Sequence, residues 1–306
     1  MTSWILSEGY AGLQAQALGL AEAAGLAPVP HVLAPRAPWR LFPAAWWPAP
    51  LAAVTLPRPW PELVVGCGGV AASVGAALRL RGRTVVQVQN PRMDPARFDL
   101  VVVNRHDELT GRNVLVTRTA LHRATPARLA AAAAVWGPRF AHLPRPLVAV
   151  LVGGTNGRFR LDAPVGSALA AQLAEMMRTD QVGLALTPSR RTDPAVVRGL
   201  SEALTPLGGY VWHGKGDNPY FGLLALADAI IVTIDSVSMI SEAVATRAPV
   251  LLAELPGRSR RISLFTAGLI ADGRVRRFSG RYEAWPVEPL DDTPEAAAEM
   301  RRRLGF

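Results

Sequence analysis

The chain has 306 residues, of which half are hydrophobic and 19% charged, enough for two domains with ordinary buried cores. No apolar run reaches the roughly 18–20 uncharged residues of a spanning helix, and the amino terminus lacks a signal-peptide pattern. We therefore expect a cytoplasmic protein. The net charge of +9 favours anionic partners, but no nucleic-acid-binding motif is present, so nucleic acid is not an expected partner.

Strand, loop and helix signals alternate along the chain, as in parallel α/β domains. In the first half they predict strands at 4–6, 63–65, 84–88 and 100–103, with helices at about 13–24, up to about 80 and at 126–136. In the second half they predict strands at 147–152, 182–187, 229–233 and 250–252, with helices at about 166–178 and up to about 245. We expect two open parallel sheets, in domains 1–144 and 145–306, with a linker at 143–146 and a C-terminal tail able to cross back to the first domain.

Ligands of such sheets bind beyond the carboxyl ends of the strands, and polar clusters fall there in the second half. The loop 153–157, with Gly154, Thr155 and Asn156, suits a phosphate but is equally explained as a tight turn. Ser189 and Arg190 follow the next strand, where arginine could clamp a diphosphate. The alternative is a solvated helix start capped at residue 192 or 193.

The strongest segment is 227–243, where a buried strand leads through a hydroxyl-rich turn to a helix. Its Asp235, Ser236, Ser238 and Met239 suit phosphate oxygens at the helix start. Glu242 lies further into the helix and suits the two hydroxyls of a ribose, unless the segment is an ordinary capping serine with a surface glutamate. Upstream, the loop 213–220 with Asn218 could cover a base or sugar, while Tyr220 and Phe221 are expected to pack.

The first half offers a second group of candidates at strand ends. These are Gly9, the loop containing Gly66, Gly68 and Gly69, the polar pair Gln89 and Asn90, and the pair His106 and Asp107. His106 beside Asp107 could act as a general base, although a structural histidine at a strand end is the more ordinary explanation. The five histidines show no metal-ligand spacing, and the single Cys67 has no nucleophile motif around it. We expect no metal and no cofactor.

The segment Arg36–Trp60 combines five large aromatic residues with arginines and many prolines. Indole rings and cations both find partners at a membrane–water interface. The alternative is a proline-braced loop whose tryptophans pack onto the first domain. An anionic membrane surface is therefore a candidate partner, which would place the protein on the inner face of the membrane.

Together these motifs resemble the mitochondrial fission ELM family, whose bacterial members carry the label nucleoside-diphosphate-sugar epimerase. The resemblance runs nearly end to end and is most specific at 235–243. It also includes the segments 89–92, 98–102, 106–107, 113–114, 153–154, 189–192 and 218–220. More distantly, the layout is similar to GT-B glycosyltransferases that build cell-envelope precursors.

The resemblance implies a GT-B-like α/β protein whose two Rossmann-type domains face a central cleft. It implies that Ser236, Ser238, Met239 and Glu242 hold a nucleotide sugar in the C-terminal domain, with Gly9 and the loop 66–69 on the acceptor side. The expected function is a metal-independent glycosyltransferase with a lipid-linked or glycan acceptor, in cell-envelope synthesis. Two alternatives remain open: an epimerase of the same fold, and a non-catalytic adaptor that keeps a relict cleft.

Overall fold

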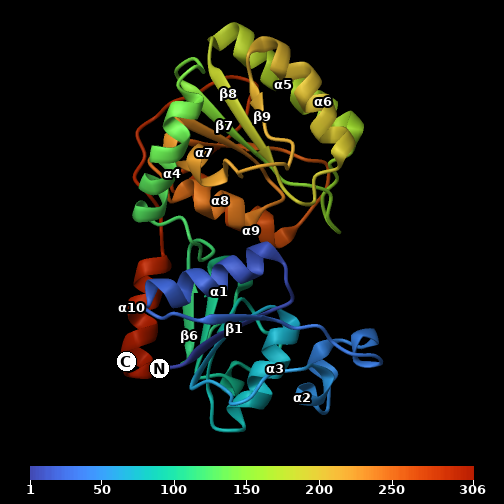
Figure 1. Ribbon diagram of the computed structural model, residues 1–306, viewed down its shortest axis with the longest axis vertical. Helices are drawn as coiled ribbons and strands as arrows, with labels where there is room; N and C mark the ends of the chain where they lie inside the picture. Colours follow the sequence, from blue (N-terminus) through green and yellow to red (C-terminus); the bar gives the residue numbers. More distant parts are fainter. The chain divides into compact units, whose positions relative to one another are not determined.

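The computed structural model describes all 306 residues and shows two compact units (Figure 1). The first comprises Met1–Arg123 with Asp291–Phe306, and the second comprises Ala124–Leu290. The boundary expected at residues 144 and 145 therefore lies about twenty residues earlier. The reason is that helix α4 (Pro126–Phe140) packs on α7 (Tyr220–Leu226), so both α4 and the segment 143–146 belong to the second unit.

The first unit contains a six-stranded parallel sheet in the order β2-β1-β3-β4-β5-β6. Its strands are β1 (Ser3–Ser7), β2 (Val29–Val32), β3 (Leu63–Cys67), β4 (Thr84–Val88), β5 (Leu100–Asn104) and β6 (Val114–Thr117). The helices are α1 (Ala11–Ala23), α2 (Pro50–Ala53), α3 (Gly69–Arg79) and α10 (Thr293–Leu304). The strands at the two edges, β2 and β6, were absent from the sequence prediction because each is short and only partly buried.

The alternation of side chains along these strands buries both faces of the first sheet. On one face, α3 and the segment between β2 and β3 cover Trp4, Leu6 and Val64. On the other face, α1 and α10 cover residues such as Ile5 and Val65. The near-continuous apolar runs seen in the sequence are therefore strands buried on both sides.

The second unit contains another six-stranded parallel sheet, in the order β12-β11-β10-β7-β8-β9. Its strands are β7 (Leu147–Val152), β8 (Gly183–Pro188), β9 (Tyr210–Val211), β10 (Ala229–Thr233), β11 (Val250–Ala253) and β12 (Val275–Arg277). Beside α4 and α7, its helices are α5 (Ala163–Asp180), α6 (Pro194–Leu204), α8 (Val237–Val244) and α9 (Arg260–Ala271). Two six-stranded parallel sheets with helices confirm the predicted α/β fold class.

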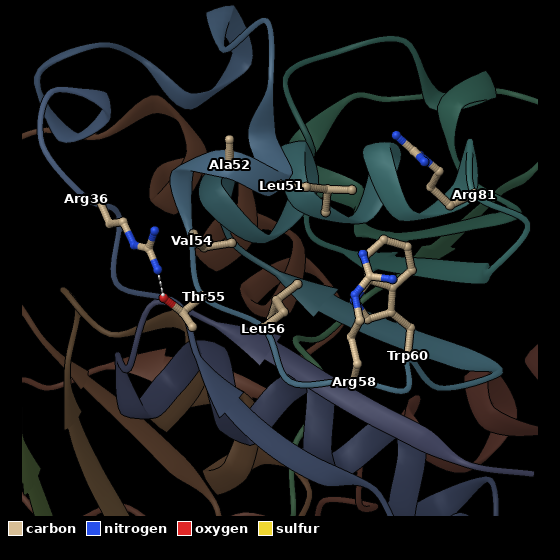
Figure 2. Close-up of a pocket in the computed structure, with 9 residues that line it drawn as sticks. All are labelled: Arg36, Leu51, Ala52, Val54, Thr55, Leu56, Arg58, Trp60 and Arg81. Atoms are coloured by element: carbon tan, nitrogen blue, oxygen red, sulfur yellow. Dashed lines mark hydrogen bonds between the residues drawn. The ribbon is translucent and has the colours of Figure 1, made fainter.

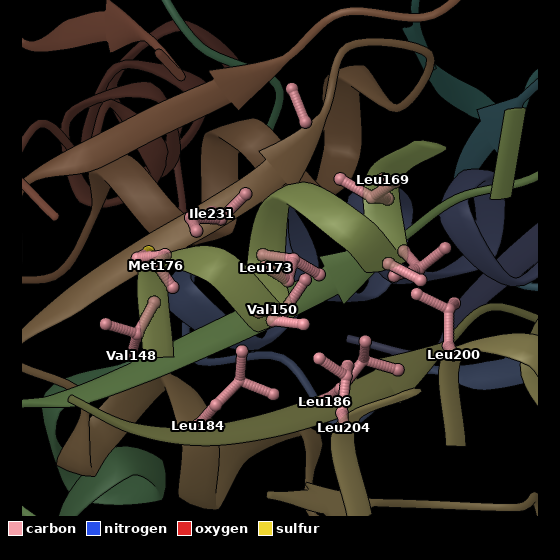
Figure 3. Close-up of a cluster of buried hydrophobic side chains, with 14 of the residues drawn as sticks. Val148, Val150, Leu169, Leu173, Met176, Leu184, Leu186, Leu200, Leu204 and Ile231 are labelled. Atoms are coloured by element: carbon pink, nitrogen blue, oxygen red, sulfur yellow. The ribbon is translucent and has the colours of Figure 1, made fainter. Parts of the chain in front are cut away.

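Helices α5 and α6 cover one face of the second sheet, where Figure 3 shows Leu173 of α5 beside Val150 of β7. Helices α4, α7, α8 and α9 cover the other face, with Trp136, Leu223 and Phe265 in that core. Because the sheet is buried on both faces, its strands can deliver functional side chains only at their ends. No helix of the structure is long and apolar enough to cross a membrane.

The chain returns to the first unit at its carboxyl end, where α10 packs beside α1 (Figure 1). The start of this segment is fixed by polar contacts with the end of the first unit's main part. The Arg118 guanidinium donates to Asp292 Oδ1, and His122 Nε2 lies 3.2 Å from Asp291 Oδ1. Burial disfavours the charged form of Asp291, but hydrogen bonds and the charge interaction with His122, together with Thr293, hold its pKa below the usual value.

We expect Asp291→Asn to lower the free energy of unfolding at neutral pH, with the loss shrinking as the solution is acidified. A carboxyl group whose pKa is lower in the folded state stabilises the fold above its unfolded pKa of about 3.9. That contribution disappears as the pH falls through the folded pKa. Urea unfolding at several pH values from 7 downwards measures it, with the exposed Glu288→Gln as control; a loss that does not change with pH would contradict the assignment.

The segment between β2 and β3 contains short 3-10 turns and α2, and its tryptophans divide into two classes. Trp47 is buried against Trp39, and its indole N–H donates to the carbonyl oxygens of Trp39 and Phe42 at 3.1 and 3.2 Å. Trp46 is 76% exposed. The packed-loop interpretation therefore holds for Trp47, and only Trp46 of the adjacent pair is exposed enough to meet another surface.

Candidate functional site

The loops after β7 and β10 meet in the second unit, because these strands are neighbours whose connections leave in opposite directions. This is the switch point at which open α/β sheets bind ligands. The two loops are joined by short hydrogen bonds. The Gly153 N–H donates to Thr233 Oγ1 at 2.7 Å, the Gly154 N–H donates to Asp235 Oδ2 at 3.1 Å, and Thr233 Oγ1 donates to Asp235 Oδ1 at 2.7 Å.

A third loop, after β8, joins this network through an arginine that the sequence did not single out. Arg191 Nη2 lies 2.9 Å from Asp235 Oδ2, and its Nη1 donates to the Gly154 carbonyl oxygen at 3.1 Å. The Asp235 side chain is 0% exposed, so this carboxylate fastens three loops of its own unit. Arg190, the residue expected as a diphosphate clamp, is exposed.

The two glycines of the β7 loop are required by close approach. A Cβ on Gly153 would lie 2.1 Å from Asp235 Oδ1, and one on Gly154 would lie 2.3 Å from the Arg191 carbonyl oxygen. A side chain at either position would therefore separate the loops. The sequence suggested that these glycines could bind a phosphate. In the structure, their lack of a side chain allows the three loops to pack together.

The remaining polar residues of these loops mainly stabilise their own turns. Thr155 Oγ1 accepts from the Leu161 N–H at 2.9 Å, and Asn156 Oδ1 accepts from the Arg158 and Phe159 N–H groups, each at 2.9 Å. Ser189 Oγ accepts from the Arg191 N–H at 3.2 Å, and Asn218 Oδ1 accepts from the Tyr220 N–H at 3.0 Å. Such local bonds are what Ser, Thr and Asn supply in turns.

Helix α8 begins directly at the switch point and carries the other candidates. Ser236 is its N-cap, and the Ser236 hydroxyl accepts from the Met239 N–H at 3.3 Å. Ser238 lies in the first turn, where backbone N–H groups have no partner within the helix. The positive end of the helix dipole therefore sits where the sequence analysis placed a phosphate.

Glu242 is 8% exposed, which rules out the surface glutamate of the alternative interpretation. Its carboxylate accepts a hydrogen bond from the hydroxyl of Tyr220, at the start of α7. Burial and the neighbouring charge of Glu242 raise the pKa of Tyr220 well above its usual value, so the phenol stays protonated. Tyr220 was expected only to pack. Like Arg191, it is therefore a residue of the site that sequence reasoning missed.

The first unit has its own switch point between β1 and β3, and a carboxylate of the chain occupies it. Glu8 Oε1 accepts from the Val70 N–H at 2.7 Å, at the amino end of α3. Gly68 has a φ of 106° and lies so close to Glu8 that a Cβ would sit 2.9 Å from Oε1. A Cβ on Gly66 would lie 2.8 Å from Gln87 Oε1, whereas Gly69 has open space and Gly9 takes a φ of 80°.

The polar residues at the ends of β4 and β5 also have hydrogen-bond partners within the first unit. Gln89 donates to Gln16 Oε1 at 3.3 Å, and Asn90 Oδ1 accepts from the Arg92 N–H at 2.8 Å. Asp107 accepts from the Asn104 N–H at 3.3 Å and closes a capping box around a 3-10 turn, while His106 is buried.

Neither a reactive cysteine nor a cluster of metal ligands emerges from the structure. Burial, followed by the charge of Glu8, raises the pKa of the Cys67 thiol far above its usual value, which leaves no thiolate for nucleophilic chemistry. No three His, Cys, Asp or Glu side chains lie together in a way that could hold a metal ion.

Known proteins resemble this chain in fold and in sequence. The structure of UDP-GlcNAc 2-epimerase from Neisseria meningitidis bound to UDP-GlcNAc is similar to 99% of this chain, with 98% of that chain covered, 11% sequence identity and a TM-score of 0.54. The structure of Medicago truncatula UGT71G1 complexed with UDP-glucose is similar to 98% of this chain, with 89% of that chain covered, 12% identity and a TM-score of 0.52. These likenesses confirm the GT-B type of fold.

The sequence relationship is closer. The chain is 35% identical over 285 residues to the mitochondrial fission protein ELM1 of Arabidopsis thaliana, covering 83% of this chain and 66% of that protein. The chain thus spans just under two thirds of its relative's length. The sequence profile of the family described as mitochondrial fission ELM1 matches residues 11–304. With the match running almost from end to end, this chain belongs to the mitochondrial fission ELM1 family.

Proposed function

We propose that this protein is a metal-independent glycosyltransferase that takes a nucleotide-diphosphate sugar at the switch point of its second unit. The observation that carries the proposal is the buried Glu242 carboxylate, held by Tyr220 behind the amino end of α8. Burying a carboxylate is costly unless it is hydrogen-bonded. A ribose, with two adjacent hydroxyl donors, is a ligand that such a group suits.

The diphosphate would lie at the amino end of α8, against the first-turn N–H groups and the hydroxyls of Ser236 and Ser238. Exposed Arg190 would approach it from the β8 loop. These groups would stabilise the negative charge that develops on the leaving diphosphate as the glycosidic bond forms. Electrostatic stabilisation by preorganised donors is a main source of catalysis in such sites.

The acceptor would be a lipid-linked or glycan hydroxyl held by the first unit, in cell-envelope synthesis. Glu8 already accepts a hydrogen bond at the amino end of α3, so this end favours a neutral or hydroxyl-bearing group over a second phosphate. His106 is the residue we assign to accept the acceptor proton. Asp107 serves the capping box beside it.

The family relationship favours a second candidate function, a non-catalytic adaptor, because the 35% identical relative is named for mitochondrial fission rather than for a reaction. A nucleotide-sugar epimerase of the same fold is the third. An epimerase alters the sugar without an acceptor, a transferase releases nucleoside diphosphate with one, and an adaptor does neither.

A thermal-shift and calorimetric screen against UDP-, GDP-, ADP- and CMP-linked sugars tests the proposal. A ligand that binds only the folded state raises its stability by about 2.7 kcal/mol at a hundred times Kd. We expect one of the UDP-, GDP- or ADP-linked sugars to bind, with its free nucleoside diphosphate competing, and the CMP-linked sugars, which carry a single phosphate, not to bind. No binder in the panel, with the protein shown to be folded, would overturn the donor site and leave the adaptor function.

A further inference from the structure

The first unit contains a pocket of about 360 Å³ that none of the proposed chemistry uses. Two of its lining residues, Trp60 and Arg81, precede β3 and β4 by three residues each. They therefore lie toward the amino ends of these strands, whereas the loop 66–69 lies at the carboxyl end of β3. A strand of five residues is about 16 Å long, so these lining residues are separated from the switch point by the length of a strand.

Positive charge dominates the polar lining of this pocket. Its lining contains Arg36, Arg58 and Arg81 and no acidic residue. Figure 2 shows Arg58 and Arg81 near Trp60, with Val54 and Leu56 between them and Arg36. Like charges gathered in one hollow repel each other, and an anion bound between them would relieve that repulsion.

The guanidinium groups of two of these arginines are oriented by neutral partners. The Arg58 guanidinium lies over the Trp60 ring, 4.4 Å from its centroid, and Arg36 Nη2 donates to Thr55 Oγ1 at 2.5 Å. Neither contact neutralises the charge. Planar guanidinium groups recognise the oxygens of phosphate and carboxylate groups through paired N–H donors, so a phosphate is an anion that this pocket can hold.

The same segment of chain also exposes large apolar side chains. Leu41 is 74% exposed, Phe42 56% and Trp46 76%. Trp47, beside Trp46, is buried and donates to the Phe42 carbonyl oxygen, so the turn that carries these exposed side chains is anchored to the first unit. Exposed aromatic side chains beside arginines are typical of segments that lie in a membrane interface.

We propose that the pocket binds the phosphate of an anionic phospholipid headgroup, while Leu41, Phe42 and Trp46 enter the adjoining acyl region. The arginines would supply the attraction to the headgroup and the exposed apolar side chains the burial in lipid. The protein would then associate with an anionic membrane surface without a spanning helix. This site is independent of the nucleotide-sugar site in the second unit.

Co-sedimentation of the full chain with vesicles tests the proposal. Vesicles of phosphatidylcholine with added phosphatidylglycerol should bind the protein, and vesicles of phosphatidylcholine alone should bind it much less. Basic residues near an anionic surface contribute about 1 kcal/mol each, so the triple variant Arg36→Gln, Arg58→Gln, Arg81→Gln should bind about 100-fold more weakly. Trp46→Ser should also weaken binding.

A matched control separates the pocket from the net charge. The triple variant Arg97→Gln, Arg112→Gln, Arg301→Gln removes three exposed arginines of the same unit that do not line the pocket. We expect it to bind within about threefold of wild type, since screening limits distant surface charges. Equal losses in both triple variants, with thermal unfolding showing both folded, would overturn the pocket.

Calorimetry with glycerol 3-phosphate distinguishes a lipid headgroup from a soluble phosphate. We expect weak binding of this soluble compound and strong binding to the anionic vesicles, because the exposed apolar side chains contribute only with lipid. Tight binding of glycerol 3-phosphate without vesicle binding would overturn the membrane assignment. Absence of binding to both would overturn the site itself.

Discussion

Glu242→Gln should weaken binding of the nucleotide sugar about 10- to 100-fold while leaving the protein folded. Hydrogen bonds to a charged group contribute about 1.5–3 kcal/mol each, and 1.4 kcal/mol corresponds to a factor of ten in Kd. The glutamine keeps the shape of the side chain and can still accept from Tyr220. The glutamine lacks the negative charge to which both ribose hydroxyls would donate hydrogen bonds.

Two further variants test whether the loss of affinity is specific to the Glu242 carboxylate. Glu202→Gln, an exposed position on α6, should leave the affinity unchanged. Tyr220→Phe should weaken binding less than Glu242→Gln, because it removes only the group that positions the carboxylate. The measurement is calorimetric titration with the nucleotide sugar that the wild type binds. An unchanged affinity in Glu242→Gln would remove Glu242 from the donor site.

The sequence predicted the central strands well because their signal is local. The strands at 84–88, 147–152 and 229–233 coincide with β4, β7 and β10, whose apolar runs follow from burial on both faces. The edge strands β2 and β9 were missed, since four and two residues leave too short a pattern. The domain boundary was misplaced because α4 belongs to the unit that follows it, which depends on packing against α7.

The candidate site shows the same division between local and long-range information. That a serine caps α8 and that a carboxylate follows inside the helix could be seen from the spacing within the segment 227–243. Which of two adjacent arginines meets Asp235 could not, because the partners are 44 residues apart in sequence. The contact of Tyr220 with Glu242 spans 22 residues and was hidden for the same reason.

Asp235→Ala should lower the free energy of unfolding of the second unit by about 3 kcal/mol. It leaves the buried Gly154 N–H and Thr233 hydroxyl without their partner, and each unsatisfied buried group costs about 1–3 kcal/mol. Arg191 adds less, because its side chain is 43% exposed and can be solvated. The measurement is calorimetric unfolding.

Asp193→Ala is the control, because it removes only the N-cap of α6 and should lower the free energy of unfolding by about 1 kcal/mol. Equal losses in both variants would contradict the role of Asp235.

Substitutions of the adjacent Arg190 and Arg191 test which of the two stabilises the fold and which binds the nucleotide sugar. Arg191→Ala removes the ion pair with Asp235 and should lower stability, while affecting nucleotide-sugar binding only through the loops it holds. Arg190→Ala should leave stability unchanged and weaken binding, since the exposed Arg190 is the residue that we assign to the diphosphate. The reverse pattern would mean that Arg191 leaves Asp235 when the ligand binds. In that case the fastening of the three loops would itself be part of the donor site.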